Sequence, residues 1–273
     1  MKRYSFSILC LLAITLFTAC QDDDNATPSP NATGALAIKF DNYVGTQPMQ
    51  IDPEGSTDYR YTTGAGQEFN LSTFRYYISN IKLEGLDGAT FEDEMNAGAS
   101  ADEVRGYYEV SESDPDTHVL ALENVPAGDY NQVTFMVGVP EEGVQDGAAG
   151  GVLDQTRGTF WTWNSGYIHL TIEGSASAVP EEGNAFALHI GGWKEVEEGD
   201  NFVDNTRTVT LNFGDVATVR EDRKPEVHIF FDMLEILNGA AVDFTQTHQV
   251  HSPVKAIPMA DEIPGAFTVD HVH

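Results

Sequence analysis

Histidine is the residue type whose spacing in this chain points most clearly to chemistry. The sequence ends in Asp-His-Val-His, which places His271 and His273 two residues apart. On a β-strand, residues i and i+2 point to the same face, with Cα atoms about 7 Å apart. Two such imidazoles can converge on one metal ion, a spacing that helices do not offer. A frayed, solvent-exposed tail is the alternative that this pattern leaves open.

Three further histidines lie in segments with strand-like alternation. In AFALHIGG the bulky apolar residues take one face, and His189 takes the other among small alanines that leave room for an imidazole. An isolated strand histidine is more often structural or exposed than a ligand. His169, in GYIHL, shares its face with polar residues, so we expect it to be exposed or hydrogen-bonded. Nothing in the sequence around His228 marks it as a ligand.

Aromatic residues concentrate in the segment GTFWTWNSGY, residues 158–167. Trp161 and Trp163 would share a face if this segment is extended. Two tryptophans at this spacing usually anchor a β core or form a platform on which a sugar ring stacks. The composition of the segment does not choose between these two uses.

Several function classes are excluded by what the chain contains. It has 43 Asp and Glu against 14 Lys and Arg, a formal net charge of −29, so it would be repelled by phosphate backbones and we expect no nucleic-acid partner. No G-x-S-x-G, HExxH or P-loop motif is present. With so many carboxylates, any acid–base pair could arise by chance. We therefore expect a protein that is not an enzyme.

The N-terminus resembles a bacterial lipoprotein signal. A short basic start is followed by a mostly apolar stretch that is too short to span a bilayer comfortably, and then by Leu-Phe-Thr-Ala-Cys. We expect residues 1–19 to be a signal peptide and Cys20 to be lipidated, with an ordinary signal peptide as the alternative. Residues 20–34 would form a disordered acidic tether. The expected location is the cell envelope, at the outer membrane, periplasmic or surface-exposed, with membrane contact through the lipid alone.

The fold class follows from apolar residues that alternate with polar ones. No 15-residue window has good helical amphipathicity, whereas period-2 alternation recurs about nine times between Gly, Pro, Asp and Asn turns. These patterns predict an all-β antiparallel β-sandwich over residues 35–273, with long acidic surface loops at 87–106 and 194–206. The expected strands include 35–40, 74–86, 117–122, 133–139, 166–173, 185–190, 207–213, 226–237 and 267–273.

One expected strand carries a more detailed prediction. In 74–86 the alternation places one set of side chains on one face, Tyr77, Ser79, Ile81 and Leu83, and the polar set on the other, Asn80, Lys82 and Glu84.

Taken together, several segments resemble the MbnP-like family of copper-binding envelope proteins, related to the methanobactin-associated protein of methanotrophs. The order and spacing of the blocks also fit, over roughly residues 34–273. The segments are YYISNIKLEG (76–85), VPAGDYNQVTFMVGV (125–139), GTFWTWNSGYIHLTIEG (158–174), FALHIGG (186–192) and FTVDHVH (267–273).

The resemblance implies a β-rich fold that holds one copper ion, Cu(I) or Cu(II), for copper acquisition, storage or buffering. It implies His189, His271 and His273 as ligands that converge near the two tryptophans. Trp161 or Trp163 would be the candidate for oxidation to kynurenine, by a di-haem partner of the MbnH/cytochrome c peroxidase-like type. The rival interpretation is a carbohydrate-binding or adhesion lipoprotein that uses an exposed platform of tryptophans, including Trp193.

Overall fold

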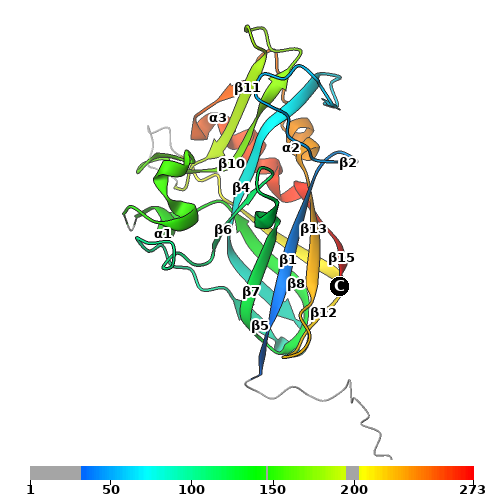
Figure 1. The fold of residues 1–273 in the computed structure, drawn as a ribbon, viewed down its shortest axis with the longest axis vertical. Helices are drawn as coiled ribbons and strands as arrows, with labels where there is room; N and C mark the ends of the chain where they lie inside the picture. The colour runs from blue at the N-terminus through cyan, green and yellow to red at the C-terminus, as the bar shows by residue number, and fades with distance from the viewer. Residues whose placement is uncertain (1–31, 146, 195–202) are drawn as a thin grey trace, which may run out of the picture.

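The computed structural model describes residues 32–145, 147–194 and 203–273 (Figure 1). The strands form two sheets. The smaller sheet has five strands, of which β15, β13, β1 and β2 are adjacent in that order and β7 pairs with β1. Its strands are β1 (Thr33–Val44), β2 (Gln47–Pro48), β7 (Val119–Pro126), β13 (Glu226–Asp232) and β15 (Phe267–Val272).

The larger sheet has ten strands, with β12, β8, β4, β10, β11 and β14 adjacent in that order. Three short strands, β3, β5 and β6, pair with β4, and β9 pairs with β10. The strands are β3 (Tyr61–Thr62), β4 (Glu68–Gly85), β5 (Thr90–Glu92), β6 (Tyr107–Ser111), β8 (Gly128–Val137), β9 (Phe160–Thr162), β10 (Gly166–Ala176), β11 (Ala185–Gly191), β12 (Arg207–Val219) and β14 (Gln249–Val250).

The main core draws apolar side chains from both sheets. It is rich in aromatic rings, and Phe40 of the small sheet meets Tyr76 and Phe135 of the large sheet edge-on, with centroids 5.9 and 5.7 Å apart. Such contacts add to the free energy of burying apolar area. The predicted all-β sandwich is therefore confirmed. A second, smaller cluster around Tyr77 and Trp193 includes residues of the irregular segment between β8 and β9.

Two strand pairs depart from the predicted antiparallel arrangement. β1 runs parallel to β13, and β11 runs parallel to β14. A parallel pair needs a long connection between its strands, and here most of the chain lies between β1 and β13. Alternation within one strand carries no information about such a distant partner.

The described residues also contain short helices. The expected strand over 226–237 is only half a strand, because β13 ends at Asp232 and a helix begins there. The Asp232 carboxylate accepts a hydrogen bond from the backbone N–H of Leu234, which caps this helix. The helices are α1 (Glu141–Gln145), α2 (Met233–Gly239) and α3 (Pro253–Glu262), with 3-10 turns η1 (Leu86–Gly88), η2 (Pro115–His118), η3 (Gly151–Leu153), η4 (Gln155–Arg157) and η5 (Ile263–Ala266).

The predicted single face of 74–86 is wrong, because a β-bulge interrupts β4. Asn80 has a φ of 50°, and the pairing of β4 with β8 shifts between Ser79 and Lys82. Tyr77 therefore packs in the smaller cluster, whereas Ile81 packs in the main core. A bulge inserts one residue and reverses which side chains face the core beyond it.

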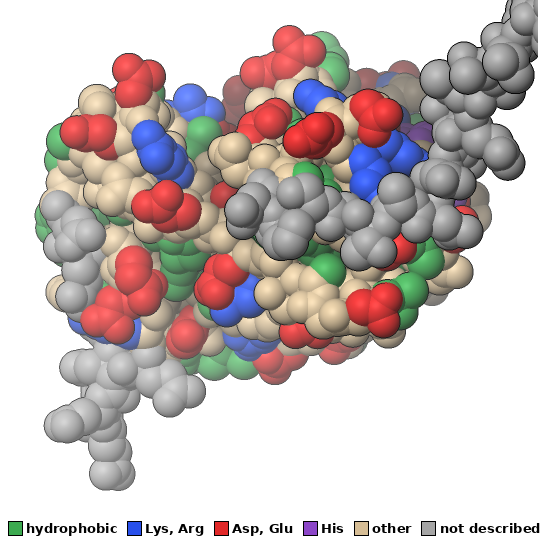
Figure 2. Space-filling model, turned by 90° about the horizontal axis from the view of Figure 1, so that it is seen from below, with side chains coloured by type: hydrophobic (Ala, Val, Ile, Leu, Met, Phe, Trp, Pro, Cys, Tyr) green, Lys and Arg blue, Asp and Glu red, His purple; other side chains and the backbone are tan. Residues whose placement is uncertain are grey.

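On the face shown in Figure 2, acidic side chains are spread over the surface and outnumber the Lys and Arg side chains that lie among them. The expected loop at 87–106 lies between strands β4 and β6, and its regular structure consists of the end of the 3-10 turn η1 and the short strand β5. The other expected loop, 194–206, falls partly outside the described residues. The predicted signal peptide, Cys20 and nearly all of the 20–34 tether also lie outside them.

Candidate metal centre

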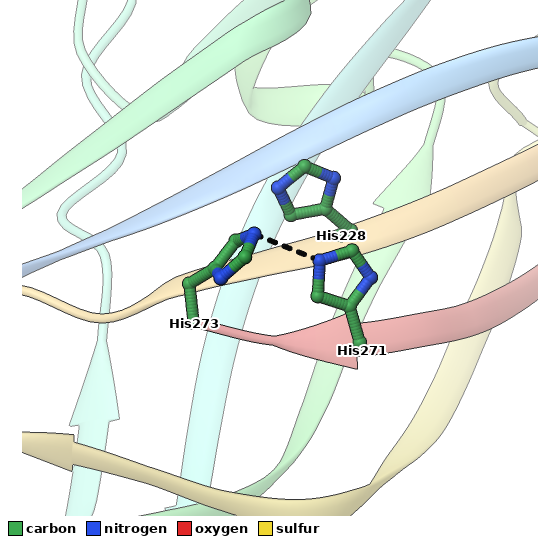
Figure 3. A group of neighbouring side chains, drawn as sticks. All are labelled: His228, His271 and His273. Carbon is green, nitrogen blue, oxygen red and sulfur yellow. Dashed lines mark hydrogen bonds between the residues drawn. The ribbon is translucent and has the colours of Figure 1, made fainter.

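Three histidines gather at the end of the small sheet. His228 lies on β13, and His271 and His273 come from the C-terminal strand β15 and the residue after it (Figure 3). Each offers one ring nitrogen, and these atoms lie within 4.8 Å of one another. In the part of the chain that the structure describes, this is the one group of three His, Cys, Asp or Glu residues found close enough to hold a metal ion.

Strand pairing explains why these rings meet. β13 and β15 are antiparallel, and His228 lies directly opposite His271. The backbones of Glu226 and His273 are hydrogen-bonded to each other, which holds the chain end against β13. His273 follows His271 by two residues and so points to the same face. The alternative of a frayed tail is therefore wrong, because this segment is a paired strand, and His271 and His273 lie side by side as expected.

Carboxylates orient two of the rings. Asp41 Oδ2 lies 3.0 Å from His228 Nδ1, and Asp270 Oδ2 lies 2.7 Å from His271 Nδ1. An Nδ1–H that donates to a carboxylate leaves Nε2 with its lone pair free for a metal, the usual arrangement behind a histidine ligand. At His228 the Nε2 atom lies 2.8 Å from Glu226 Oε1, so a bound metal would have to replace this hydrogen bond, with Glu226 as a neighbouring oxygen ligand.

The ring geometry suits a compact ion. The His271 and His273 Nε2 atoms are 2.9 Å apart. Two nitrogens bound to one tetrahedral ion at about 2.05 Å each lie about 3.3 Å apart, so small movements of these two rings admit a metal. The His228 ring is stacked on that of His271, with centroids 4.4 Å apart, and would have to turn to direct a nitrogen at the same ion. The His228 side chain is 10% exposed and that of His271 is 42% exposed, so the cluster is anchored on one side and open on the other.

The donor set narrows the choice of metal. The cluster offers three imidazole nitrogens and neighbouring carboxylates, without a thiolate. Imidazole suits copper, zinc and nickel, and the affinity of such sites for divalent ions peaks at copper. Magnesium and calcium prefer an all-oxygen set. The residues present therefore fit copper.

His189 is not part of this cluster. β15 contacts β12, which is one edge strand of the large sheet, whereas β11 lies beside β14 at the opposite edge. In Figure 1, β11 lies near the upper end of the molecule and the C-terminus lies in the lower half. The structure thus brings together two of the three expected ligands and places His189 elsewhere. Periodicity within a strand cannot show which edge of which sheet the strand occupies.

His189 instead contacts His251, which follows β14. Their Nδ1 atoms are 3.1 Å apart, and Glu173 Oε1 lies 2.6 Å from His189 Nε2. Burial is the largest cause that lowers the pKa of His251, followed by the nearby His189. The hydrogen bond from His189 lowers the pKa of Glu173. The expected face pattern of β11 is also present, with Phe186 inward and His189 outward.

The tryptophans lie by the large sheet. Trp161 is the central residue of β9, and a methyl group added to Gly191 of β11 would meet its ring atom Cζ3 at 3.1 Å. Trp163 lies just beyond β9, is 48% exposed, and meets Phe160 edge-on with centroids 5.2 Å apart. Trp193 is buried at 6% exposure. Of the two expected cofactor tryptophans, Trp161 is therefore on β9 and Trp163 directly follows it, and β9 pairs with β10 and not with the small sheet.

His169 contradicts its prediction of an exposed or hydrogen-bonded side chain. It is fully buried, because β10 is a central strand with packed groups on both faces. Within the described residues, neither ring nitrogen has a hydrogen-bond partner of normal geometry. Desolvation lowers the pKa of His169 to about 4, and the nearby Asn205 backbone opposes this change. The ring is therefore neutral at pH 7.

His228 is the residue that sequence reasoning missed. The segment EVHIFF alternates, with Val227 and Ile229 buried in the core and His228 on the opposite face. That pattern matches the one around His189, so an outward histidine was detectable. The pairing of His228 with His271 on β15 was not detectable, because it joins segments about 40 residues apart in the sequence.

Comparisons with known proteins identify one family. A family model described as MbnP matches residues 33–253. Among solved structures, MbnP from Methylosinus trichosporium is similar, with a TM-score of 0.48 and 16% sequence identity, over 79% of this chain and 78% of that chain. No curated protein matches. The family match ends before His271 and His273 and therefore assigns them no role.

The described residues include no helix with both the length and the apolar character that crossing a bilayer requires.

Proposed function

This chain belongs to the MbnP family, as its resemblance predicted, and we propose that it binds one copper ion through His228, His271 and His273. The observation that carries this proposal is the convergence of three imidazoles, two of them held at Nδ1 by aspartates. A carboxylate behind the ring is the usual partner of a metal-bound histidine. The role is copper acquisition, storage or buffering, without catalysis.

The charge of the chain supports this role. A net charge of −29 attracts cations to the surface and raises their concentration near an exposed site. Lys39 lies opposite His228 in the pairing of β1 with β13, and its charge is neutralised by Asp41, whose Oδ1 is 3.2 Å from Lys39 Nζ. A lipid on Cys20 would hold the domain at the outer membrane, in the periplasm or at the surface.

A titration with Cu(I), without oxygen and against a competing chelator, tests the proposal. We expect His228→Ala to weaken binding at the cluster at least about tenfold, since losing a ligand costs no less than losing an orienting group. His248→Ala is the matched control, because His248 is also paired with a carboxylate, Glu181 at 3.0 Å, but lies outside the cluster. Equal copper binding by the wild type and His228→Ala would refute the site.

Tryptophan oxidation and a di-haem partner extend the same proposal. Trp161 packs against Gly191 of β11, the strand that carries His189, so its oxidation would take place near His189 and not at the three-histidine cluster. Intact-mass analysis of protein purified from its native cells would show the change from tryptophan to kynurenine. If the native protein binds copper and contains no kynurenine, the proposals of a modified tryptophan and of a di-haem partner are both wrong.

The carbohydrate-binding alternative has narrower support. Trp163 is exposed at 48%, but Trp193 is buried and Trp161 is half-buried against Gly191. One exposed ring does not form a stacking platform by itself. Glycan binding that is lost in Trp163→Ala would favour this alternative over copper.

A further inference from the structure

A second histidine cluster lies on the outer face of the large sheet, around the pair His189 and His251. Strands β10, β11 and β14 are adjacent there, and the parallel register pairs Leu188 with Val250, which places His251 beside His189. The two rings meet edge-on, with centroids 4.7 Å apart. The sheet itself therefore holds the pair together.

The hydrogen bonds of the pair determine where its protons lie. His189 Nε2 is 2.6 Å from Glu173 Oε1, and His251 Nε2 is 2.8 Å from Gln249 Oε1. Both oxygens are acceptors, so each Nε2 carries the proton of its ring. In two neutral rings, each Nδ1 then has a lone pair and no proton.

These two lone pairs face each other at 3.1 Å, the separation of the Nδ1 atoms. Two acceptors at this distance repel unless a cation lies between them. Nitrogens bound to one ion at about 2.05 Å in adjacent positions lie about 3.3 Å apart, so the observed spacing is close to that of a shared metal ion. The carboxylate behind His189 is the orienting partner that metal-bound histidines have.

The surroundings leave room for the ion and its other ligands. The His189 side chain is 15% exposed, while His251 is exposed. Water or a small anion can therefore complete the coordination from the solvent-exposed side of His251.

We propose that His189 and His251 form a second transition-metal site, which holds an imidazole-preferring ion such as Cu(II) through their Nδ1 atoms. This site is separate from the three-histidine cluster and does not rest on the proposed function. It gives His189 a ligand role with a different partner from the one expected from the sequence. The chain then binds two ions, one on each sheet.

A Cu(II) titration of the full chain followed by electron paramagnetic resonance tests this site. The background variant carries His228→Ala, His271→Ala and His273→Ala, which removes the other cluster. We expect this variant to retain one equivalent of copper with nitrogen ligands. Adding His251→Ala should weaken that binding at least about tenfold. Equal binding with and without His251→Ala would overturn the proposal.

Two controls separate the possible outcomes. His248→Ala in the same background removes a neighbouring histidine that contacts Glu181 instead, and should leave the copper signal unchanged. Because His251 is exposed, its loss should not unfold the chain, and a thermal melt without metal checks this. If the background variant binds as many ions as the wild type, the three-histidine proposal fails while the paired site stands. If it binds none, the paired site fails.

Discussion

Because His169 is buried, we predict that the protein loses stability in acid, and the size of the loss follows from the lowered pKa of this ring. In the unfolded chain this ring takes up a proton below pH 6.5, but in the folded protein burial lowers its pKa to about 4. Between these values the unfolded state binds more protons, so acid favours unfolding. The contribution of the neutral His169 ring to the free energy of unfolding is fully present above pH 6.5 and is lost as the pH falls from 6.5 to 4.

The magnitude can be worked out from the same shift. A pKa that falls from 6.5 to about 4, at about 1.4 kcal/mol per pH unit, corresponds to about 3 kcal/mol in full. By pH 4.5 about 2.5 kcal/mol of it is lost.

The assay is urea unfolding at pH 7.5 and at pH 4.5, for the wild type and for His169→Phe. Carboxylates titrate equally in both proteins, so the difference between them isolates His169. We expect the free energy of unfolding of the wild type to fall by about 2.5 kcal/mol more than that of the variant. An equal fall in both proteins would show that the ring is solvated or hydrogen-bonded, and would refute the reasoning.

Three further substitutions test other parts of the structure. The Glu109 side chain is 3% exposed and lies between Arg75 and Arg157. Urea unfolding should show that Glu109→Ala lowers the free energy of unfolding by about 3 kcal/mol and that Glu109→Gln lowers it by less. Gly138→Ala should lower stability by more than about 2 kcal/mol, because its φ is 126° and a Cβ would lie 2.7 Å from His169 Nδ1; a thermal melt close to wild type would contradict this. Asp270→Asn should weaken copper binding about tenfold in the chelator competition, since its carboxylate orients His271; unchanged affinity would mean that this contact has no part in binding.

Local patterns in the sequence predicted the sandwich and much of one cluster. Alternation placed His271 and His273 on one face, and it correctly set His189 opposite Phe186. These are properties of a single strand, and a period of two expresses them directly. The same reasoning would have found His228 had its alternation been given equal weight.

Three sequence-based predictions are wrong for a common physical reason. The place of a residue in a sheet depends on how its strand pairs with segments far away in the sequence. His169 was expected to be exposed because its neighbours are polar, but β10 is central in its sheet and both faces are covered. His189 was expected beside the terminal histidines, but β11 and β15 belong to different sheets. The bulge at Asn80 moved Tyr77 away from the face of Ile81. None of these arrangements is encoded in a local repeat.

The location of bound copper tests the central claim most directly. Crystals of the protein grown with copper, measured at the copper absorption edge, would show each bound ion as an anomalous difference peak. We predict a peak within about 2.1 Å of a ring nitrogen from each of His228, His271 and His273. Copper bound elsewhere, with no peak at these three rings, would contradict the proposed site.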